Sequence, residues 1–192
     1  MKTKAMKTVM PKLLSLILLF FVVACSSDDD GDGEDNPDVI NEQETITTVR
    51  LTVTEEGSTE DPDEYTWLDG DESVAITLSA DSSYNFKLEF LDESDPAEVE
   101  DITEEVIELA DEHYVFFETA DLMGTSFTSA SDDTIDSDDI GINLSTDWTT
   151  TDASTGLIRA YLIHEPTTKS GSVRDDFGGD TDVQVDFDVT IE

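Results

Sequence analysis

Two histidines are the side chains of this sequence best suited to bind a metal ion or carry a proton at neutral pH. His113 follows Glu112 and precedes an apolar run, whereas His164 ends another apolar run. Two imidazoles and one carboxylate suit first-row transition metals. We therefore expect a metal site at His113, His164 and Glu112 if their two strands are neighbours. Otherwise each histidine is an ordinary hydrogen-bonded or surface residue.

A second group of candidate ligand-binding residues surrounds two tryptophans. Tyr65 and Trp67 stand just before an acidic turn that contains Asp69 and Asp71, and Trp148 lies in a Ser/Thr-rich segment. Exposed aromatic rings at the rim of a β-sandwich stack on sugars or anchor a protein partner. Asp69 and Asp71 would offer oxygen ligands to calcium, although such turns are also common in hairpins. The alternative is that both tryptophans belong to the edge of the core.

Motifs for catalysis are missing from the sequence. It contains no G-x-S-x-G, H-E-x-x-H, P-loop or G-x-G-x-x-G pattern. With 48 acidic residues, chance carboxylate pairs are certain, so they do not argue for a glycoside hydrolase. We therefore predict a protein that is not an enzyme, with a paired-carboxylate hydrolase as an alternative.

The charge balance excludes whole classes of partner. The 192 residues include 48 Asp and Glu against 9 Lys and Arg, which gives a formal net charge of −39. Nucleic-acid binders and polybasic membrane-surface proteins need a basic face, which this chain cannot supply. High ionic strength would screen the self-repulsion, so we predict a marine or halophilic setting. The alternative is a surface that binds cations or cationic partners.

The N-terminus has the pattern of a bacterial lipoprotein signal peptide. Four lysines precede an apolar run at residues 13–24, which is too short to span a bilayer. The run ends in Val-Val-Ala before Cys25, the single cysteine of the chain, and this resembles a lipobox. The resemblance implies that the signal at residues 1–24 is removed and that Cys25 carries palmitate-type acyl chains, which anchor the protein to a membrane. The alternative is an ordinary cleaved signal with an incidental cysteine.

The segment that follows Cys25 is acidic and polar. Residues 25–44 contain no basic residue and have too few apolar residues to form a core, so we predict a disordered tether. The stretch Ser27-Asp28-Asp29-Asp30 resembles the export signal of lipoproteins in Bacteroidota. That resemblance implies display on the outer face of the outer membrane.

Residues 45–192 have the pattern of a mainly β domain. Apolar and polar residues alternate at residues 49–54, 84–90 and 183–191, which is typical of antiparallel strands with one wet face. We expect about nine strands in an antiparallel β-sandwich or small barrel. In strand geometry, each histidine shares a face with apolar neighbours. Less regular candidate strands lie at residues 65–68, 74–78, 114–118, 126–129, 140–144 and 157–164.

One helix is expected near residues 96–111. Asp95 is a good N-cap, Pro96 suits the first helical position, and Glu98 stands three residues after the cap. The apolar residues then recur at helical spacing. They are Val99, Ile102, Val106, Leu109 and Ala110.

Three stretches together resemble a group of small uncharacterised flavobacterial surface lipoproteins. They are residues 46–52, residues 101–105 with 110–113, and residues 178–183. Some members are labelled "type 1 periplasmic binding fold", which alternates strands and helices around parallel sheets. One helix among about nine strands argues against that label for this chain.

Together these patterns predict an outer-membrane, surface-exposed lipoprotein with a non-catalytic binding domain. Its ligand would be a cation, a glycan or a protein. The main alternative is a metal- or haem-handling lipoprotein that uses the two histidines. The sequence establishes no cofactor, and a divalent cation is the candidate.

Overall fold

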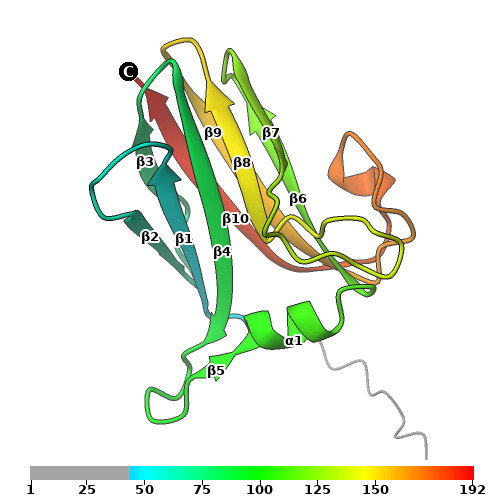
Figure 1. Cartoon of the computed structure of the whole chain (residues 1–192). Coiled ribbons are helices and arrows are strands. Elements are labelled where there is room, and N and C mark those ends of the chain that lie inside the picture. Colours follow the sequence, from blue (N-terminus) through cyan, green and yellow to red (C-terminus); the bar gives the residue numbers. More distant parts are fainter. Residues whose placement is uncertain (1–43) are drawn as a thin grey trace, which may run out of the picture. The chain divides into compact units, whose positions relative to one another are not determined.

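The computed structural model describes residues 44–192, and their fold is mainly β (Figure 1). The predicted signal peptide, Cys25 and all of the predicted tether except Glu44 lie outside the described residues. Within the described part, no helix has the length and apolar character needed to cross a membrane.

Two sheets pack face to face as a β-sandwich, which confirms the predicted fold class. The larger sheet has the strand order β2-β1-β4-β8-β7, with β5 paired to β4, and the smaller has the order β3-β10-β9-β6. All neighbouring strands are antiparallel except β3 and β10, which are parallel. The strands are β1 (Thr48–Glu55), β2 (Asp63–Leu68), β3 (Val74–Leu78), β4 (Ser82–Asp92), β5 (Glu100–Asp101), β6 (His113–Ala120), β7 (Thr125–Ser129), β8 (Ser145–Thr150), β9 (Ser154–His164) and β10 (Asp180–Ile191).

The strand β8 was not predicted, because polar side chains occupy its inner face. Thr146, Trp148 and Thr150 are all buried there. The Thr146 hydroxyl accepts a hydrogen bond from Trp148 Nε1, and the Thr150 hydroxyl donates one to the carbonyl of Ser79. These hydrogen bonds offset the cost of burying two threonine hydroxyls. The threonines nevertheless interrupt the alternation of apolar and polar residues that predicts a strand. The predicted strand at residues 140–144 is wrong and contains only an isolated bridge.

The helix α1 (Ile102–Glu108) is shorter than predicted and begins six residues later. Asp95 does accept a hydrogen bond from Ala97 N, but in a turn that does not continue as a helix. The extended pair β5 follows and delays the start of the helix. Asp101 is the actual N-cap and accepts from the backbone N–H of Thr103 at 3.0 Å.

The helix crosses one end of the sandwich, between the two sheets (Figure 1). We call this end, where β1 and β6 begin and β9 ends, the foot of the sandwich. The inner faces of both sheets form one apolar core above it. A second cluster covers the outer face of β6 and β9, so these strands are packed on both sides at the foot. Its buried members are Phe116, Tyr161, Ile163 and Phe177, the last following the short 3-10 turn η1 (Arg174–Asp176).

Candidate metal centre

The two histidines form a cross-strand pair at the foot of the sandwich. Strands β6 and β9 are antiparallel neighbours, and their register places His113 directly opposite His164. The two rings stack with centroids 4.9 Å apart and planes inclined by 19°. The inner face of β6 carries His113 below Val115 and Phe117, as expected from strand geometry. The structure therefore brings together the two imidazoles that the sequence leaves 51 residues apart.

His113 is positioned with a free nitrogen inside the domain. Its side chain has no exposed surface, and its Nδ1–H donates to the carbonyl of Leu109, 3.1 Å away at the end of α1. Nε2 therefore carries the lone pair, and it has no hydrogen-bond partner among the described residues. Burial lowers the pKa of His113 to about 4, so the ring is neutral at pH 7. A neutral imidazole held by a carbonyl is the usual state of a metal-binding histidine.

Asp182 enters the same space through a β-bulge. The register of β10 against β9 shifts between Thr181 and Val183, which leaves Asp182 as the extra residue. A bulge of this kind re-aims a side chain, and the Asp182 carboxylate is only 1% exposed. Its Oδ1 lies 3.9 Å from His164 Nδ1, and neither oxygen has a hydrogen-bond partner among the described residues. Burial raises the pKa of this carboxyl to about 6.

Glu44 lies beside His113 on the other side of the pair. Its Oε1 is 3.8 Å from His113 Nε2, its side chain is only 9% exposed, and Oε2 is buried without a partner among the described residues. Burial raises the pKa of Glu44 to about 7, and the negative charges of Glu105, Asp182 and Glu100 raise it further. Glu44 was assigned to the tether from its acidic surroundings, yet its side chain packs into the foot of the sandwich.

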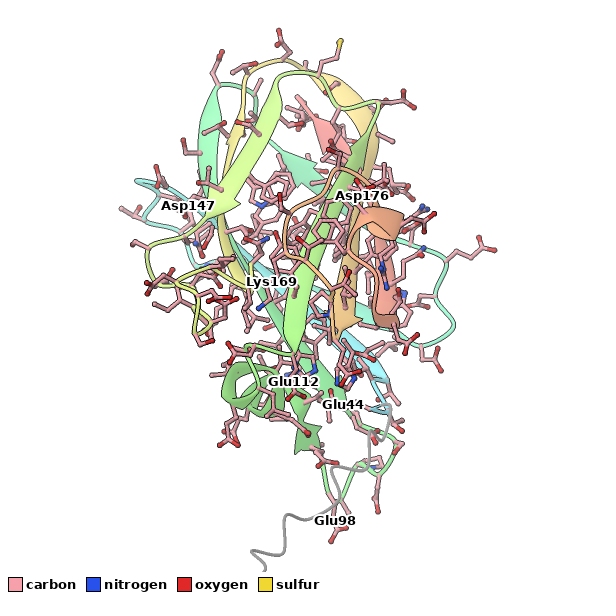
Figure 2. All side chains as sticks on the ribbon, turned by 90° about the vertical axis from the view of Figure 1, so that its right-hand side faces the viewer. Glu44, Glu98, Glu112, Asp147, Lys169 and Asp176 are labelled. Carbon is pink, nitrogen blue, oxygen red and sulfur yellow. The ribbon has the colours of Figure 1, made fainter. Side chains whose placement is uncertain are left out.

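Glu112 approaches the histidine pair from outside. Its Oε2 is 4.0 Å from His164 Nε2, the ring nitrogen that faces away from Asp182, and its side chain is 43% exposed. Together with Glu165, it forms a second, more exposed group of potential ligand atoms around His164. Figure 2 shows Glu112 and Glu44 at the same end of the domain, beside α1. At 4.0 Å Glu112 makes no hydrogen bond to His164, but a small shift of its exposed side chain would let it accept the outer N–H, as carboxylates do behind metal-bound imidazoles.

His113, His164 and Asp182, which we call the inner site, have the geometry of an open ligand set. One ligand atom from each lies within 4.8 Å of the others. Tetrahedral zinc, with bonds of about 2.1 Å, places its ligand atoms about 3.4 Å apart, so each atom must move by no more than about 1 Å. A buried polar atom without a partner costs about 1–3 kcal/mol, and a metal ion would remove that cost at several atoms together.

Haem does not fit this arrangement. A haem iron is reached only when the macrocycle lies against the ligating nitrogen. His113 has no exposed side-chain surface, and the ring of His164 is stacked on it. The inner site therefore suits a bare ion.

The acidic turn after β2 is occupied by its own hydrogen bonds. The Asp71 carboxylate accepts from the backbone N–H of Leu68, and the Asp71 carbonyl accepts from Trp67 Nε1. Neither Asp69 nor Asp71 belongs to a group of three potential metal ligands among the described residues. The expected calcium site at this turn therefore gains no support.

The expectation of exposed tryptophans is wrong. Trp148 is 1% exposed and stacks on Phe86 and Phe127, with centroids 5.1 and 4.6 Å away. Trp67 is 7% exposed, and Tyr65 is partly buried against the same core. Rings that fill a core are not available to stack on a sugar.

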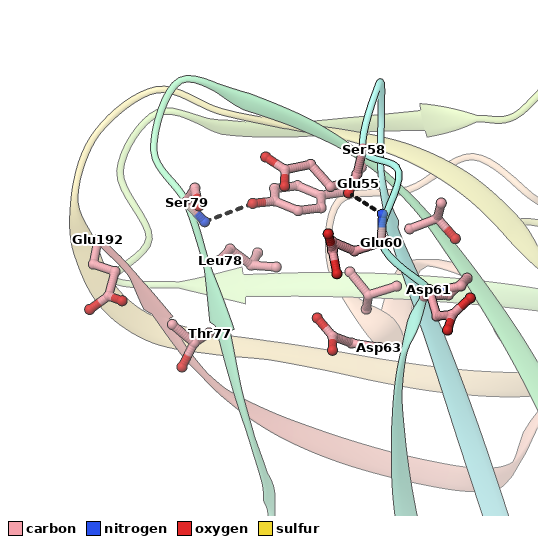
Figure 3. Close-up of a pocket in the computed structure, with 13 residues that line it drawn as sticks. Glu55, Ser58, Glu60, Asp61, Asp63, Thr77, Leu78, Ser79 and Glu192 are labelled. Carbon is pink, nitrogen blue, oxygen red and sulfur yellow. Dashed lines mark hydrogen bonds between the residues drawn. The ribbon is translucent and has the colours of Figure 1, made fainter.

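A cavity of about 560 Å³ lies at the end of the sandwich opposite the inner site (Figure 3). Several carboxylates line it, but no histidine does. The hydroxyl of Tyr84 accepts from the backbone N–H of Ser79, so the polar ring end is already partnered. This cavity is the weaker candidate because acidic groups at a surface are common without a ligand. The carboxylates belong to Glu55, Glu60, Asp61, Asp63 and Glu192.

The chain matches no protein-family model, no curated protein and no solved structure. The resemblance to flavobacterial surface lipoproteins therefore stays a prediction. The inner site and the pattern of the N-terminus are the two features of the chain that bear on its function.

Proposed function

We propose that this protein is a surface-exposed outer-membrane lipoprotein whose β-sandwich binds a divalent transition-metal ion at His113, His164 and Asp182. One observation carries the proposal. His113, His164 and Asp182 each offer one ligand atom within 4.8 Å of the others, and the buried Nε2 of His113 and both buried oxygens of Asp182 have no hydrogen-bond partner among the described residues. Native proteins rarely leave such groups unpaired without an ion, a water or a function.

The ligand chemistry selects the class of metal. Two imidazole nitrogens and carboxylate oxygens suit zinc, copper(II) or nickel, whereas calcium and magnesium prefer oxygen ligands alone. Zinc requires the smallest movement of the ligand atoms, because it accepts a four-coordinate, tetrahedral set of side chains. We therefore use zinc as the test ion and calcium as its control.

The charge of the domain supports the binding of a cation. Three of its basic side chains already pair with carboxylates, in Arg50–Glu93, Arg159–Asp186 and Lys169–Asp136. The many remaining acids keep the surface negative, and such a field raises the local concentration of cations. Membrane attachment through Cys25 would hold this domain at the cell surface, where it would capture or retain metal without catalysis.

Calorimetric titration of the full chain with zinc tests this function. We expect one zinc ion per chain, no comparable binding of calcium, and loss of the zinc signal in His164→Ala. His164 is preferred to His113 for substitution because its side chain is 12% exposed, so its removal leaves a smaller internal cavity. Asp175→Asn is the control, since this exposed carboxylate lies outside the inner site. Equal zinc binding by wild type and His164→Ala would refute the proposal.

A further inference from the structure

Glu44 is a buried carboxylate that the surrounding protein does not stabilise. Its side chain is nine-tenths buried, and its Oε2 has no hydrogen-bond partner among the described residues. The carboxylates of Glu105, Asp182 and Glu100 lie near it. Burying an ionised group without a partner is costly. A cation beside Glu44 would turn this unfavourable position into a favourable one.

The backbone does not hold Glu44 in place. No backbone hydrogen bond joins residues 44–46 to another described residue, and the first is donated by Thr47 N to the carbonyl of Leu91 at 3.0 Å. Ile46 packs against the core. Glu44 itself is held at the foot of the sandwich by its buried side chain and by no backbone hydrogen bond to another described residue. The Oε1 atom of Glu44 lies 3.8 Å from Nε2 of the neutral His113 ring. Glu44 therefore lies beside the ring nitrogen of His113 that is free to bind a metal.

The three-residue inner site lacks a fourth ligand and a second negative charge, and Glu44 would supply both. His113, His164 and Asp182 supply three ligands, which would leave the fourth position of a tetrahedral ion open, as in catalytic zinc sites. The Glu44 carboxylate lies outside the 4.8 Å group but only 3.8 Å from His113 Nε2, so a shift of its side chain toward the ion would close that position, as in structural sites. Two carboxylates would also neutralise the charge of a divalent ion, and a neutral cluster is far less costly to bury than an unpaired charge.

We infer that Glu44 is the fourth metal ligand, so that metal binding fastens residues 44–47, which precede β1, onto the foot of the domain. This inference rests on the proposed metal-binding function. Glu44 is the first described residue, and the predicted lipidation site precedes it by 19 positions. Metal occupancy would thereby decide whether residues 44–47 are held against the histidine pair. The ion is held in a closed site and not presented to a substrate.

Hydrogen exchange of the full chain in detergent, with and without zinc, tests this inference. We expect zinc to slow the exchange of the amides at residues 45–47 in wild type and in Glu98→Gln. In Glu44→Gln and Glu44→Ala, zinc should give no protection there, and zinc affinity should fall at least about tenfold. Glu98 is the matched control because it is an exposed glutamate at the same end of the domain (Figure 2).

The outcomes separate the inference from the proposed function. If both Glu44 variants bind zinc as tightly as wild type, or if zinc protects residues 45–47 equally in them, Glu44 is not a ligand and the three-ligand site stands. If wild type does not bind zinc at all, the proposed function and the role of Glu44 are both overturned. Selective loss of protection and affinity in the Glu44 variants would support the inference.

Discussion

The substitution Asp182→Asn should have opposite effects on stability without and with metal. Asn has nearly the same shape as Asp but carries no charge. In the absence of metal, the wild-type protein keeps a carboxyl that is 1% exposed and has no hydrogen-bond partner among the described residues. Removing its charge should therefore stabilise the domain at pH 8, whereas the same change removes a ligand when zinc is present.

The size of the first effect follows from the pKa of Asp182. Its folded-state value of about 6 lies above the unfolded value of about 3.9. A raised carboxyl pKa contributes stability below the unfolded value, and that stability is lost as the pH rises through 6. Two units correspond to about 3 kcal/mol. The Asn amide also lacks partners, so we expect Asp182→Asn to be about 1–2 kcal/mol more stable than wild type at pH 8.

The size of the second effect follows from mass action. Zinc at 100 times its dissociation constant stabilises the native state by about 2.7 kcal/mol. Wild type should gain this amount, while Asp182→Asn should gain much less. For a domain of this size, 1 kcal/mol shifts the melting temperature by about 2–4 °C. The order of the two melting temperatures should therefore reverse when chelator is replaced by zinc.

Thermal melts of the full chain provide the assay. Wild type, Asp182→Asn and the exposed control Asp175→Asn are compared at pH 8 and constant ionic strength, with chelator or zinc. At pH 4 the carboxyl is protonated in the folded state, so the difference without metal should shrink. If Asp182→Asn is less stable than wild type with chelator, or if zinc stabilises both equally, the reasoning about the inner site is refuted.

Three further predictions concern single residues that hold the fold together. Gly179→Ala should destabilise the fold and weaken zinc binding more than Gly57→Ala, as measured by melts and titration. Both glycines have positive φ, but only the first would place a Cβ 2.2 Å from the carbonyl of His164. Thr150→Val should cost about 1 kcal/mol in denaturant melts, because the buried Thr150 hydroxyl no longer donates to the Ser79 carbonyl. Asp101→Ala should cost about 1 kcal/mol by loss of the N-cap, and no loss would contradict its capping role.

Much of the fold was predictable because its central strands follow simple alternation. The pattern at residues 183–191 corresponds to β10, and that at residues 84–90 to β4. The strand β8 was missed because hydrogen-bonded threonines replace apolar residues on its inner face. The start of α1 was misplaced because Asp95 and Asp101 are equally good caps, and only pairing of β5 with β4 decides between them.

The candidate site was predictable only in part. The residue types and faces of His113 and His164 could be read locally, but their opposition depends on the pairing of β6 with β9. Asp182 was missed because perfect alternation places it outside with Gln184, and the bulge that turns it inward leaves no local signal. Glu44 was missed because it ends an acidic stretch in which no single acid stands out.

X-ray absorption at the zinc edge of the zinc-loaded full chain tests the central claim most directly. The account predicts one zinc per chain with two imidazole nitrogens and oxygen ligands at about 2.0–2.2 Å. The imidazole signal should disappear in His164→Ala, while Asp175→Asn should keep it. Zinc surrounded by oxygen alone, or no stoichiometric zinc in the wild-type chain, would contradict the account.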